Sequence, residues 1–306
     1  MGRFDDRATQ PARGPGDILR WKLGKKDPRP DDFRALDAVR PQRVGGGAEA
    51  LARPDACAVW IGHATWALRL GGKLIVTDPI WSRSISGAVK RISPPGIELP
   101  AMPPIDIVLV THDHRDHMDM PTLAQLPHAA TYVTGAGNGD RLSKLGHPNV
   151  VELDWWESHR IGDLELTFVP ARHWSMRMPW NRNDALWGGF VMRGPEGVAY
   201  HSGDTAWGDH FDEIADKSPP IDWAMLPIGG YAPRWFMHTQ HIDPVEAGQA
   251  FTALRAKHLL AMHWGTFRLT DEAVGEPVAR LRTWWSQSGL AADRLWIPDL
   301  GEPRRL

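Results

Sequence analysis

Residues 110–117 read Val110-Thr111-His112-Asp113-His114-Arg115-Asp116-His117, and this stretch decides the fold. The apolar run from Ile105 to Thr111 predicts a buried strand, so three imidazoles and the carboxylate of Asp116 leave that strand within one short loop. Zinc accepts neutral imidazole nitrogens and carboxylate oxygens as ligands, and iron and manganese also accept histidine. A chance cluster of surface histidines is not expected directly after a buried strand. We therefore interpret the loop as one that can supply ligands to two metal ions.

Three further candidate ligands also follow predicted strands. They are His173 after residues 164–170, Asp204 after 198–202, and His263 after 259–262. Each alone would be a weak signal, because a histidine after a strand is more often structural and Gly-Asp-Thr is often only a turn. Loops at strand ends can, however, converge on one rim of a fold. Together the residues predict one metal site with the ligands His112, His114, Asp116, His117, His173, Asp204 and His263.

The rest of the chain predicts the fold class. Residues 67–70 and 74–77 flank a Gly-Gly turn, which predicts a hairpin. Helices are expected to begin after Asp119 and at Asp243, each followed by a proline, and the second helix is expected to run to about Lys257. Hairpins mixed with strand–helix units indicate an α/β sandwich, with sheets inside and helices outside. Further strands are predicted at 164–170, 186–193, 197–202, 222–227 and 258–263.

Residues 1–55 differ from the rest in composition. They are rich in Arg, Lys, Asp, Pro and Gly, and show little periodicity that would bury a face. We interpret them as an extended arm packed on or near a domain formed by residues 56–306. Apolar and basic residues alternate within the arm, and the apolar ones could touch a membrane surface or, as we favour, anchor the arm on its own domain. These residues are Ile18, Leu19, Trp21 and Leu23, beside Arg20, Lys22, Lys25 and Lys26.

Composition and charge exclude several classes of protein. The chain has 306 residues and a net charge of -2, so no global positive field would draw it onto nucleic acid. Cys57 is the only cysteine, which excludes an internal disulfide and a site with several thiolate ligands. No apolar run reaches the roughly 18 residues of a membrane span, and none has the form of a secretion signal. We expect a cytoplasmic protein without a signal peptide or transmembrane segment, and at most peripheral at the membrane.

The chain resembles the metallo-β-lactamase superfamily, whose HxHxDH signature is matched by residues 112–117. The resemblance extends to its N-acyl-phosphatidylethanolamine-hydrolysing phospholipase D branch over roughly residues 57–277. It implies that superfamily's αββα sandwich, in which two mixed β-sheets are flanked by helices. The strings that carry it are Ile61-Gly62-His63-Ala64-Thr65, Thr77-Asp78-Pro79, Glu152-Leu153-Asp154-Trp155-Trp156-Glu157, His173-Trp174-Ser175, Leu186-Trp187-Gly188, Pro233-Arg234-Trp235-Phe236-Met237, Gln240-His241 and Met262-His263-Trp264-Gly265-Thr266-Phe267.

The resemblance implies a binuclear metal centre and a reaction. Zinc is the expected metal, with iron and manganese as alternatives. The implied reaction is hydrolysis of a phosphodiester, such as N-acyl phosphatidylethanolamine, by a hydroxide that bridges the two metals. In the family's pattern one metal is held by His112, His114 and His173, the other by Asp116, His117 and His263, and Asp204 bridges both.

The branch resemblance also puts Gln240 and His241 near the metals. His241 is our candidate for holding the phosphate or protonating the leaving alkoxide, and it completes a catalytic set with Asp116 and Asp204. The alternative is that His241 caps the helix begun at Asp243. His63 is expected to orient a ligand or to be a buried structural histidine. Substrate contacts are assigned to Gln240, His241, His63, Trp174 and Tyr231.

Several alternatives stay open at this point. The same metal centre could open a lactone or another activated acyl ester, and a metal-binding sensor would use the site for binding alone. No ligand is missing, which favours an enzyme. The expected partners are a small-molecule or phospholipid phosphodiester and a second copy of the chain, without nucleic acid. Trp174, Met176, Met178 and Trp180 could line an acyl-chain groove or form the core under a long loop, and Arg177 and Arg234 could bind phosphate or be structural.

Overall fold

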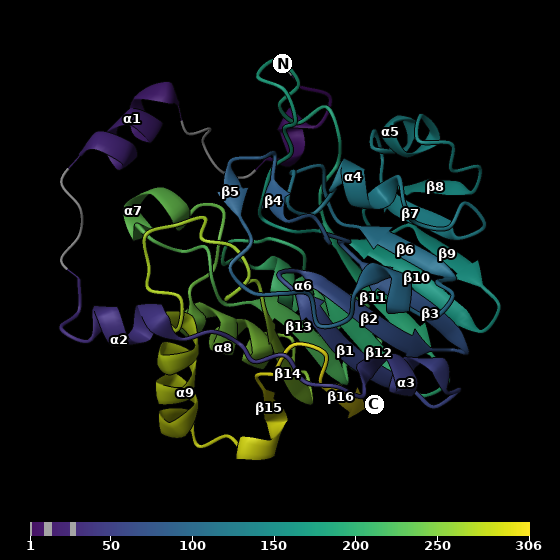
Figure 1. The fold of residues 1–306 in the computed structure, drawn as a ribbon. Coiled ribbons are helices and arrows are strands. Elements are labelled where there is room, and N and C mark those ends of the chain that lie inside the picture. Colours follow the sequence, from purple (N-terminus) through teal and green to yellow (C-terminus); the bar gives the residue numbers. More distant parts are fainter. Residues whose placement is uncertain (1, 9–13, 25–28) are drawn as a thin grey trace.

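The computed structural model describes residues 2–8, 14–24 and 29–306. Within these ranges, two seven-stranded sheets form the centre of the molecule (Figure 1). The first sheet has the strand order β16-β1-β2-β3-β6-β7-β8, and the second has the order β15-β14-β13-β12-β11-β10-β9. The strands of the first sheet are β1 Cys57–Gly62, β2 Thr65–Leu70, β3 Lys73–Thr77, β6 Ile107–Val110, β7 Thr131–Gly135, β8 Val150–Leu153 and β16 Pro303–Arg305. Those of the second are β9 Ser158–Ile161, β10 Leu164–Val169, β11 Gly189–Gly194, β12 Gly197–His201, β13 Trp223–Pro227, β14 His258–Met262 and β15 Leu295–Trp296. A separate short hairpin consists of β4 Ser84–Ile85 and β5 Val89–Lys90.

Helices cover the outer faces of both sheets (Figure 1). On the first sheet these are α3 Gly47–Ala52, α4 Met120–Leu123 and α5 Gly139–Ser143. On the second they are α6 His210–Lys217, α8 Pro244–Ala253 and α9 Glu276–Ser288. The remaining helices are α1 Pro15–Leu23, α2 Phe33–Ala38 and α7 Arg234–Met237, with short 3-10 turns at Asp5–Arg7, Leu99–Ala101 and Ala292–Arg294. The αββα sandwich implied by the sequence is therefore confirmed.

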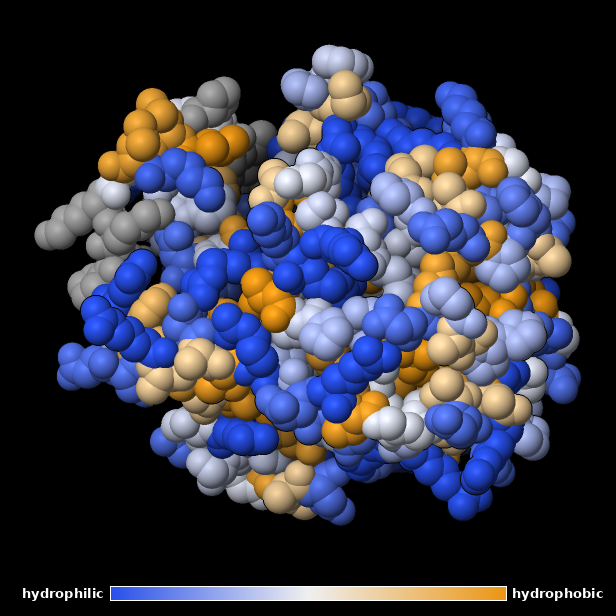
Figure 2. Space-filling model, in the orientation of Figure 1, coloured by the Kyte–Doolittle hydropathy of each residue, from blue (hydrophilic) through white to orange (hydrophobic). Residues whose placement is uncertain are grey.

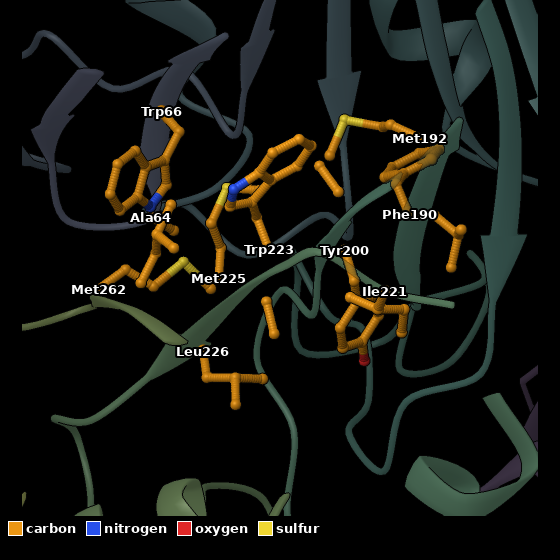
Figure 3. Close-up of a cluster of buried hydrophobic side chains, with 14 of the residues drawn as sticks. Ala64, Trp66, Phe190, Met192, Tyr200, Ile221, Trp223, Met225, Leu226 and Met262 are labelled. Carbon is orange, nitrogen blue, oxygen red and sulfur yellow. The ribbon is translucent and has the colours of Figure 1, made fainter. Parts of the chain in front are cut away.

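The main apolar core fills the layer between the two sheets. Successive side chains of a strand point to opposite faces, so Ala58 and Trp60 of β1 enter this layer, whereas Val59 and Ile61 pack on the outer face under the helices. Both faces of the first sheet are thus buried, which holds its strands and the loops that leave them. Figure 3 shows side chains that both sheets contribute to the layer, among them Trp66, Phe190, Trp223, Met225 and Met262.

Strand direction sets the position of the predicted ligands. In the first sheet β1, β3 and β6 run the same way, because β1 and β3 are both antiparallel to β2 and β3 is parallel to β6. In the second sheet β10, β12 and β14 run the same way for the equivalent reason. The loops after these strands therefore leave each sheet at the same end, where the C-termini of these strands lie. Every predicted ligand follows β6, β10, β12 or β14.

Most of the elements predicted from the sequence are confirmed. The hairpin is β2–β3, and the predicted strands correspond to β6, β10, β11, β12, β13 and β14. The helix after Asp119 is only one short turn, and α8 ends at Ala253 rather than at Lys257 because Arg255 adopts a left-handed backbone with φ 54°. Strands β8 and β9 were not predicted, because they lie at sheet edges and lack a fully buried apolar pattern.

The arm is more structured than the extended segment we expected, because it contains α1, α2 and α3. Val44 N donates to Leu300 O over 2.9 Å, which ties the arm to the domain. Our preferred interpretation, that the apolar residues of the arm pack on the domain, is right for Trp21, which donates to Asp271 Oδ2 over 2.8 Å. It is wrong for Ile18, Leu19 and Leu23, which are exposed. Lys25 and Lys26 lie outside the described residues.

A helix that crosses a membrane must be both long and apolar. Within the described ranges, every helix is too short or too polar to cross a bilayer.

Candidate metal centre

The predicted ligands meet at one edge of the sandwich, on loops that follow four different strands. Residues 112–117 lie between β6 and α4, His173 follows β10, Asp204 follows β12 and His263 follows β14. Gly203 lets Asp204 reach this edge, because its backbone is left-handed (φ 59°) and a Cβ there would lie 2.8 Å from the Cβ of Thr111. The loops thus bring all seven residues into two adjacent groups of donor atoms.

The first group consists of His112, His114, His173 and Asp204, whose donor atoms all lie within 4.8 Å of one another. His112 Nε2 is 2.9 Å from His114 Nδ1, and His173 Nε2 is 3.1 Å from the same atom. Three ring nitrogens that converge in this way can direct their lone pairs at one point. A divalent ion about 2.0–2.1 Å from each nitrogen would accept all three.

The second group consists of Asp116, His117 and His263 together with His63. His63 Nε2 lies 3.0 Å from Asp116 Oδ2, so His63 either orients this carboxylate or is itself a ligand. Asp204 approaches this group as well: its Oδ2 is 3.1 Å from His117 Nε2 and its Oδ1 is 3.2 Å from His263 Nε2. The carboxylate of Asp204 therefore lies between the two groups.

Unpaired buried atoms in the two groups indicate that these residues fit a metal ion. Across the described part of the chain, His117 Nε2, His263 Nε2 and Asp204 Oδ1 are buried and have no hydrogen-bond partner. A buried polar atom left unpaired costs about 1–3 kcal/mol, so several of them in one place need a common ligand. A cation between these atoms would satisfy all of them.

Three of the ligand histidines are oriented through their second ring nitrogen. Such contacts fix the tautomer and the direction of the ring, and so pre-arrange the nitrogen that faces the metal. The pairs are His112 Nδ1 with Thr111 Oγ1 at 2.9 Å, His117 Nδ1 with Asp78 Oδ2 at 2.8 Å, and His173 Nδ1 with the main-chain oxygen of Gln240 at 2.9 Å.

Asp78 is a residue of this site to which the sequence reasoning assigned no role. Besides contacting His117, it accepts hydrogen bonds from the amide and the hydroxyl of Thr111, both over 2.8 Å. It is fully buried with a left-handed backbone (φ 37°), a strained conformation for a residue other than glycine. A signal was present in the sequence, because Asp78 directly follows a predicted strand, as the ligands do.

We expect the Asp78→Asn protein to bind zinc about 10–100-fold more weakly, because an amide cannot hold the His117 ring as a carboxylate does. Competition with a chromophoric chelator measures this affinity. Asp55→Asn, the same substitution at an exposed carboxylate, is the control. Equal zinc affinities for the two variants would rule out an orienting role for Asp78.

Burial and charge set the protonation of the ligand histidines. Burial lowers the pKa of His114 to about 4 and that of His173 to about 3, so both rings are neutral near pH 7, the form that binds a metal. Burial also opposes a charge on His117, but the surrounding carboxylates, first that of Asp204, raise its pKa well above the ordinary value. The centre therefore attracts positive charge, which a metal ion would supply.

His241 lies beside both groups of donor atoms. Its ring is 5.3 Å from that of His173 and 5.8 Å from that of His263, and its Nδ1 is 3.9 Å from Asp204 Oδ2. The alternative that His241 caps α8 is wrong, because Asp243 Oδ1 accepts hydrogen bonds from the amides of residues 245 and 246. The His241 side chain is 14% exposed, which leaves it open toward the solvent side of the centre.

The other residues assigned to substrate contacts have structural partners. Gln240 Oε1 accepts a hydrogen bond from Trp174 Nε1 over 2.6 Å, so the two side chains hold each other at the rim. Tyr231 needs a correction: it is buried, its hydroxyl donates to Glu276 Oε1 over 2.7 Å, and it lines a different cavity with Arg280. Sequence adjacency to the site did not reveal which way the Tyr231 side chain points.

The structure bears on the alternatives that the sequence left open for the loop after His173 and for Arg177 and Arg234. Met178 and Trp180 are exposed, so the interpretation of this cluster as a core under a long loop is wrong for them. Arg177 Nη1 donates to the main-chain oxygens of Asp113 and Met118, at 2.9 and 2.8 Å. Arg234 Nη2 donates to both carboxylate oxygens of Glu246, over 2.9 Å each. Both arginines are structural, as arginines near acidic groups usually are.

Comparison with known proteins agrees with this geometry. Residues 73–264 match the β-lactamase superfamily domain. An uncharacterised protein of Mycobacterium tuberculosis is 35% identical over 86% of this chain and 72% of its own length. N-acyl-phosphatidylethanolamine-hydrolyzing phospholipase D 1 of Caenorhabditis elegans is 32% identical over 83% of this chain and 76% of its own length.

A solved structure shares the fold. A metallo hydrolase of the archaeon Ignicoccus hospitalis superposes with a TM-score of 0.62 at 20% identity, covering 82% of this chain and 98% of that one. Family match, relatives, fold and donor groups agree, and we conclude that the chain belongs to the metallo-β-lactamase superfamily and is a metal-dependent hydrolase.

Proposed function

We propose that the chain is a phosphodiesterase of the phospholipase D type, which uses two divalent metal ions and acts on N-acyl phosphatidylethanolamine or a related phosphodiester. The observation that carries the proposal is the position of Asp204 between two groups of donor atoms: its Oδ2 is 3.1 Å from His117 Nε2 in one group and 3.9 Å from His173 Nε2 in the other. The relative from Caenorhabditis elegans, named for this reaction, supports the substrate class. Zinc suits the mixed imidazole and carboxylate donors.

The residues of the chain have distinct tasks in this reaction. Two metal ions held here would supply Lewis acidity, which activates water and balances charge on the phosphodiester oxygens. Asp204 would help to hold both ions through its carboxylate, and Asp116 would help to hold only the ion beside His117 and His263. The neutral rings of His112, His114 and His173 would complete one site, and those of His117 and His263 the other. Hydrolysis would add water across the P–O bond to the ethanolamine oxygen, giving a phosphatidate and an N-acylethanolamine.

We assign to His241 the task of contacting the phosphate or the leaving oxygen. Among the described residues its Nδ1 is buried without a hydrogen-bond partner, 3.9 Å from Asp204 Oδ2, while the side chain as a whole is 14% exposed. An imidazole there can donate an N–H to a phosphate oxygen, or pass a proton to the leaving alkoxide.

Replacing His241 by Ala should therefore lower kcat by about 100-fold or more, the range expected for loss of a positioned proton donor. Because none of the seven metal ligands is changed, metal content should stay at the wild-type value. His238→Ala, an exposed histidine three positions earlier in the chain, is the matched control. Full turnover of the His241→Ala protein with normal metal content would remove His241 from the mechanism.

The proposal itself is tested by purifying the protein without chelator and counting metals per chain. Turnover of bis-p-nitrophenyl phosphate, an N-acyl phosphatidylethanolamine and a simple lactone is then measured side by side. Two metals and turnover of the phosphodiesters alone are expected. Turnover of the lactone alone would instead assign the site to acyl-ester hydrolysis, and metal binding without any turnover would indicate a sensor.

A further inference from the structure

We propose that the surface formed by α1 and the loop 174–184 docks on a lipid bilayer that contains anionic phospholipids. The inference rests on the proposed lipid phosphodiesterase function for its purpose, but the docking itself is measured without turnover.

Helix α1 presents an apolar face to solvent. Ile18, Leu19 and Leu23 are 48%, 60% and 78% exposed, and their spacing in the helix puts them on one side. The exposed Lys22 lies beside them, with its Nζ 3.7 Å from the centre of the Trp21 ring. Figure 2 shows the apolar residues gathered over α1. Three neighbouring aliphatic side chains on one helical turn and a half form a patch that needs a partner, unlike single exposed residues.

The opposite face of α1 fixes the helix on the domain, so the apolar face is held outward. Trp21 packs on Phe236 of α7 with ring centroids 5.0 Å apart, and its Nε1 donates to Asp271. Arg20 lies 4.4 Å over the ring of Trp235, also in α7. These contacts leave Ile18, Leu19 and Leu23 pointing away from the domain.

The sequence in and after α1 carries an excess of positive charge, which favours an anionic partner. Residues 14–26 contain four basic residues against one acidic residue, although the whole chain has a net charge of -2. A cation interleaved with aliphatic side chains is the pattern of a helix that lies in a membrane interface. Two copies of α1 facing each other would bring like charges together, which disfavours a second copy as the occupant. The residues are Arg20, Lys22, Lys25 and Lys26 against Asp17.

A second segment with exposed apolar residues is the loop after His173. Trp180 is 77% exposed and Met178 is 39% exposed. Tryptophan is favoured at membrane interfaces because its ring is apolar and its indole N–H is polar. Two segments, each with apolar side chains in solvent, would thus contact the bilayer.

Contacts link both segments to the metal centre. Helix α7, which supports α1, ends at Met237, four residues before His241. Trp174, at the start of the other segment, donates to Gln240 Oε1 over 2.6 Å, and the main chain of Gln240 binds His173. A bilayer on this surface would therefore present headgroups at the side of the centre where His241 is open.

The test is sedimentation of the full chain with vesicles of phosphatidylcholine, with and without phosphatidylglycerol. We expect binding to the anionic vesicles, lowered about tenfold for each leucine removed in Leu19→Glu and Leu23→Glu. Lys22→Glu should weaken binding to anionic vesicles at low salt and have little effect at high salt. Val44→Glu, a similar change at an exposed valine beside Leu300, is the control and should bind as wild type.

Folding and turnover are checked separately. All four variants change exposed side chains, so their melting temperatures and their turnover of soluble bis-p-nitrophenyl phosphate should equal those of wild type. Wild-type protein that stays in the supernatant with every vesicle, or leucine variants that bind as well as wild type, would overturn the proposal. A dimer that Leu19→Glu dissociates would assign the patch to a second copy. Failure of phosphodiester turnover with intact vesicle binding would remove the proposed function and leave the docking surface.

Discussion

Replacing Asp204 by Asn should lower kcat by more than about 100-fold. Loss of a residue that only orients a metal ligand typically lowers activity by about 10–100-fold, so the expected effect is larger. Asp204 Oδ2 lies 3.1 Å from His117 Nε2 in one donor group and 3.9 Å from His173 Nε2 in the other, so one carboxylate serves both groups of donors. Asn has nearly the same size but carries no charge, and its amide nitrogen cannot act as a ligand. Metal content should fall together with turnover.

Metal analysis after gel filtration and turnover of bis-p-nitrophenyl phosphate measure both effects of the Asp204 substitution. Asp209→Asn makes the same chemical change at an exposed position five residues later and should match wild type in both. If the Asp204→Asn protein retained wild-type metal content and kcat, Asp204 would not lie between two metals, and the binuclear assignment would fail.

Removal of metal should abolish turnover and lower the melting temperature by about 5 °C. A ligand present at 100 times its Kd stabilises the folded state by ~2.7 kcal/mol, and for a chain of this size each kcal/mol corresponds to about 2 °C. The buried atoms His117 Nε2 and Asp204 Oδ1 lose their common partner when the metal is removed. Scanning calorimetry with and without dipicolinate, followed by dialysis, measures the shift.

Re-addition of metal separates the chelator's action from damage to the protein. Turnover should return on addition of zinc, iron or manganese, and the ion that restores the highest kcat identifies the preferred metal. The Asp204→Asn protein should show a smaller change in melting temperature on chelation than wild type. Full turnover by protein whose measured metal content is close to zero would exclude metal-dependent hydrolysis.

The sequence by itself determined the local parts of the site. The HxHxDH loop after an apolar run identified four candidate ligands, because strand periodicity and imidazole spacing are both local properties. His173, Asp204 and His263 were found in the same way, each directly after a predicted strand. The hairpin β2–β3 and the start of α8 at Asp243 followed from a Gly-Gly turn and from a capping aspartate before proline.

Only the tertiary structure decided how these parts meet and which side chains have other partners. Asp78 and His117 are 39 positions apart in sequence and are joined because β3 and β6 are adjacent parallel strands. Tyr231 is adjacent in sequence to Gly230, which touches the centre, yet its hydroxyl binds Glu276 in a different cavity. Likewise the exposure of Leu23 depends on where Trp21 anchors α1. Sequence periodicity reports which side of a strand or helix is apolar, but sheet order and packing decide what that side contacts.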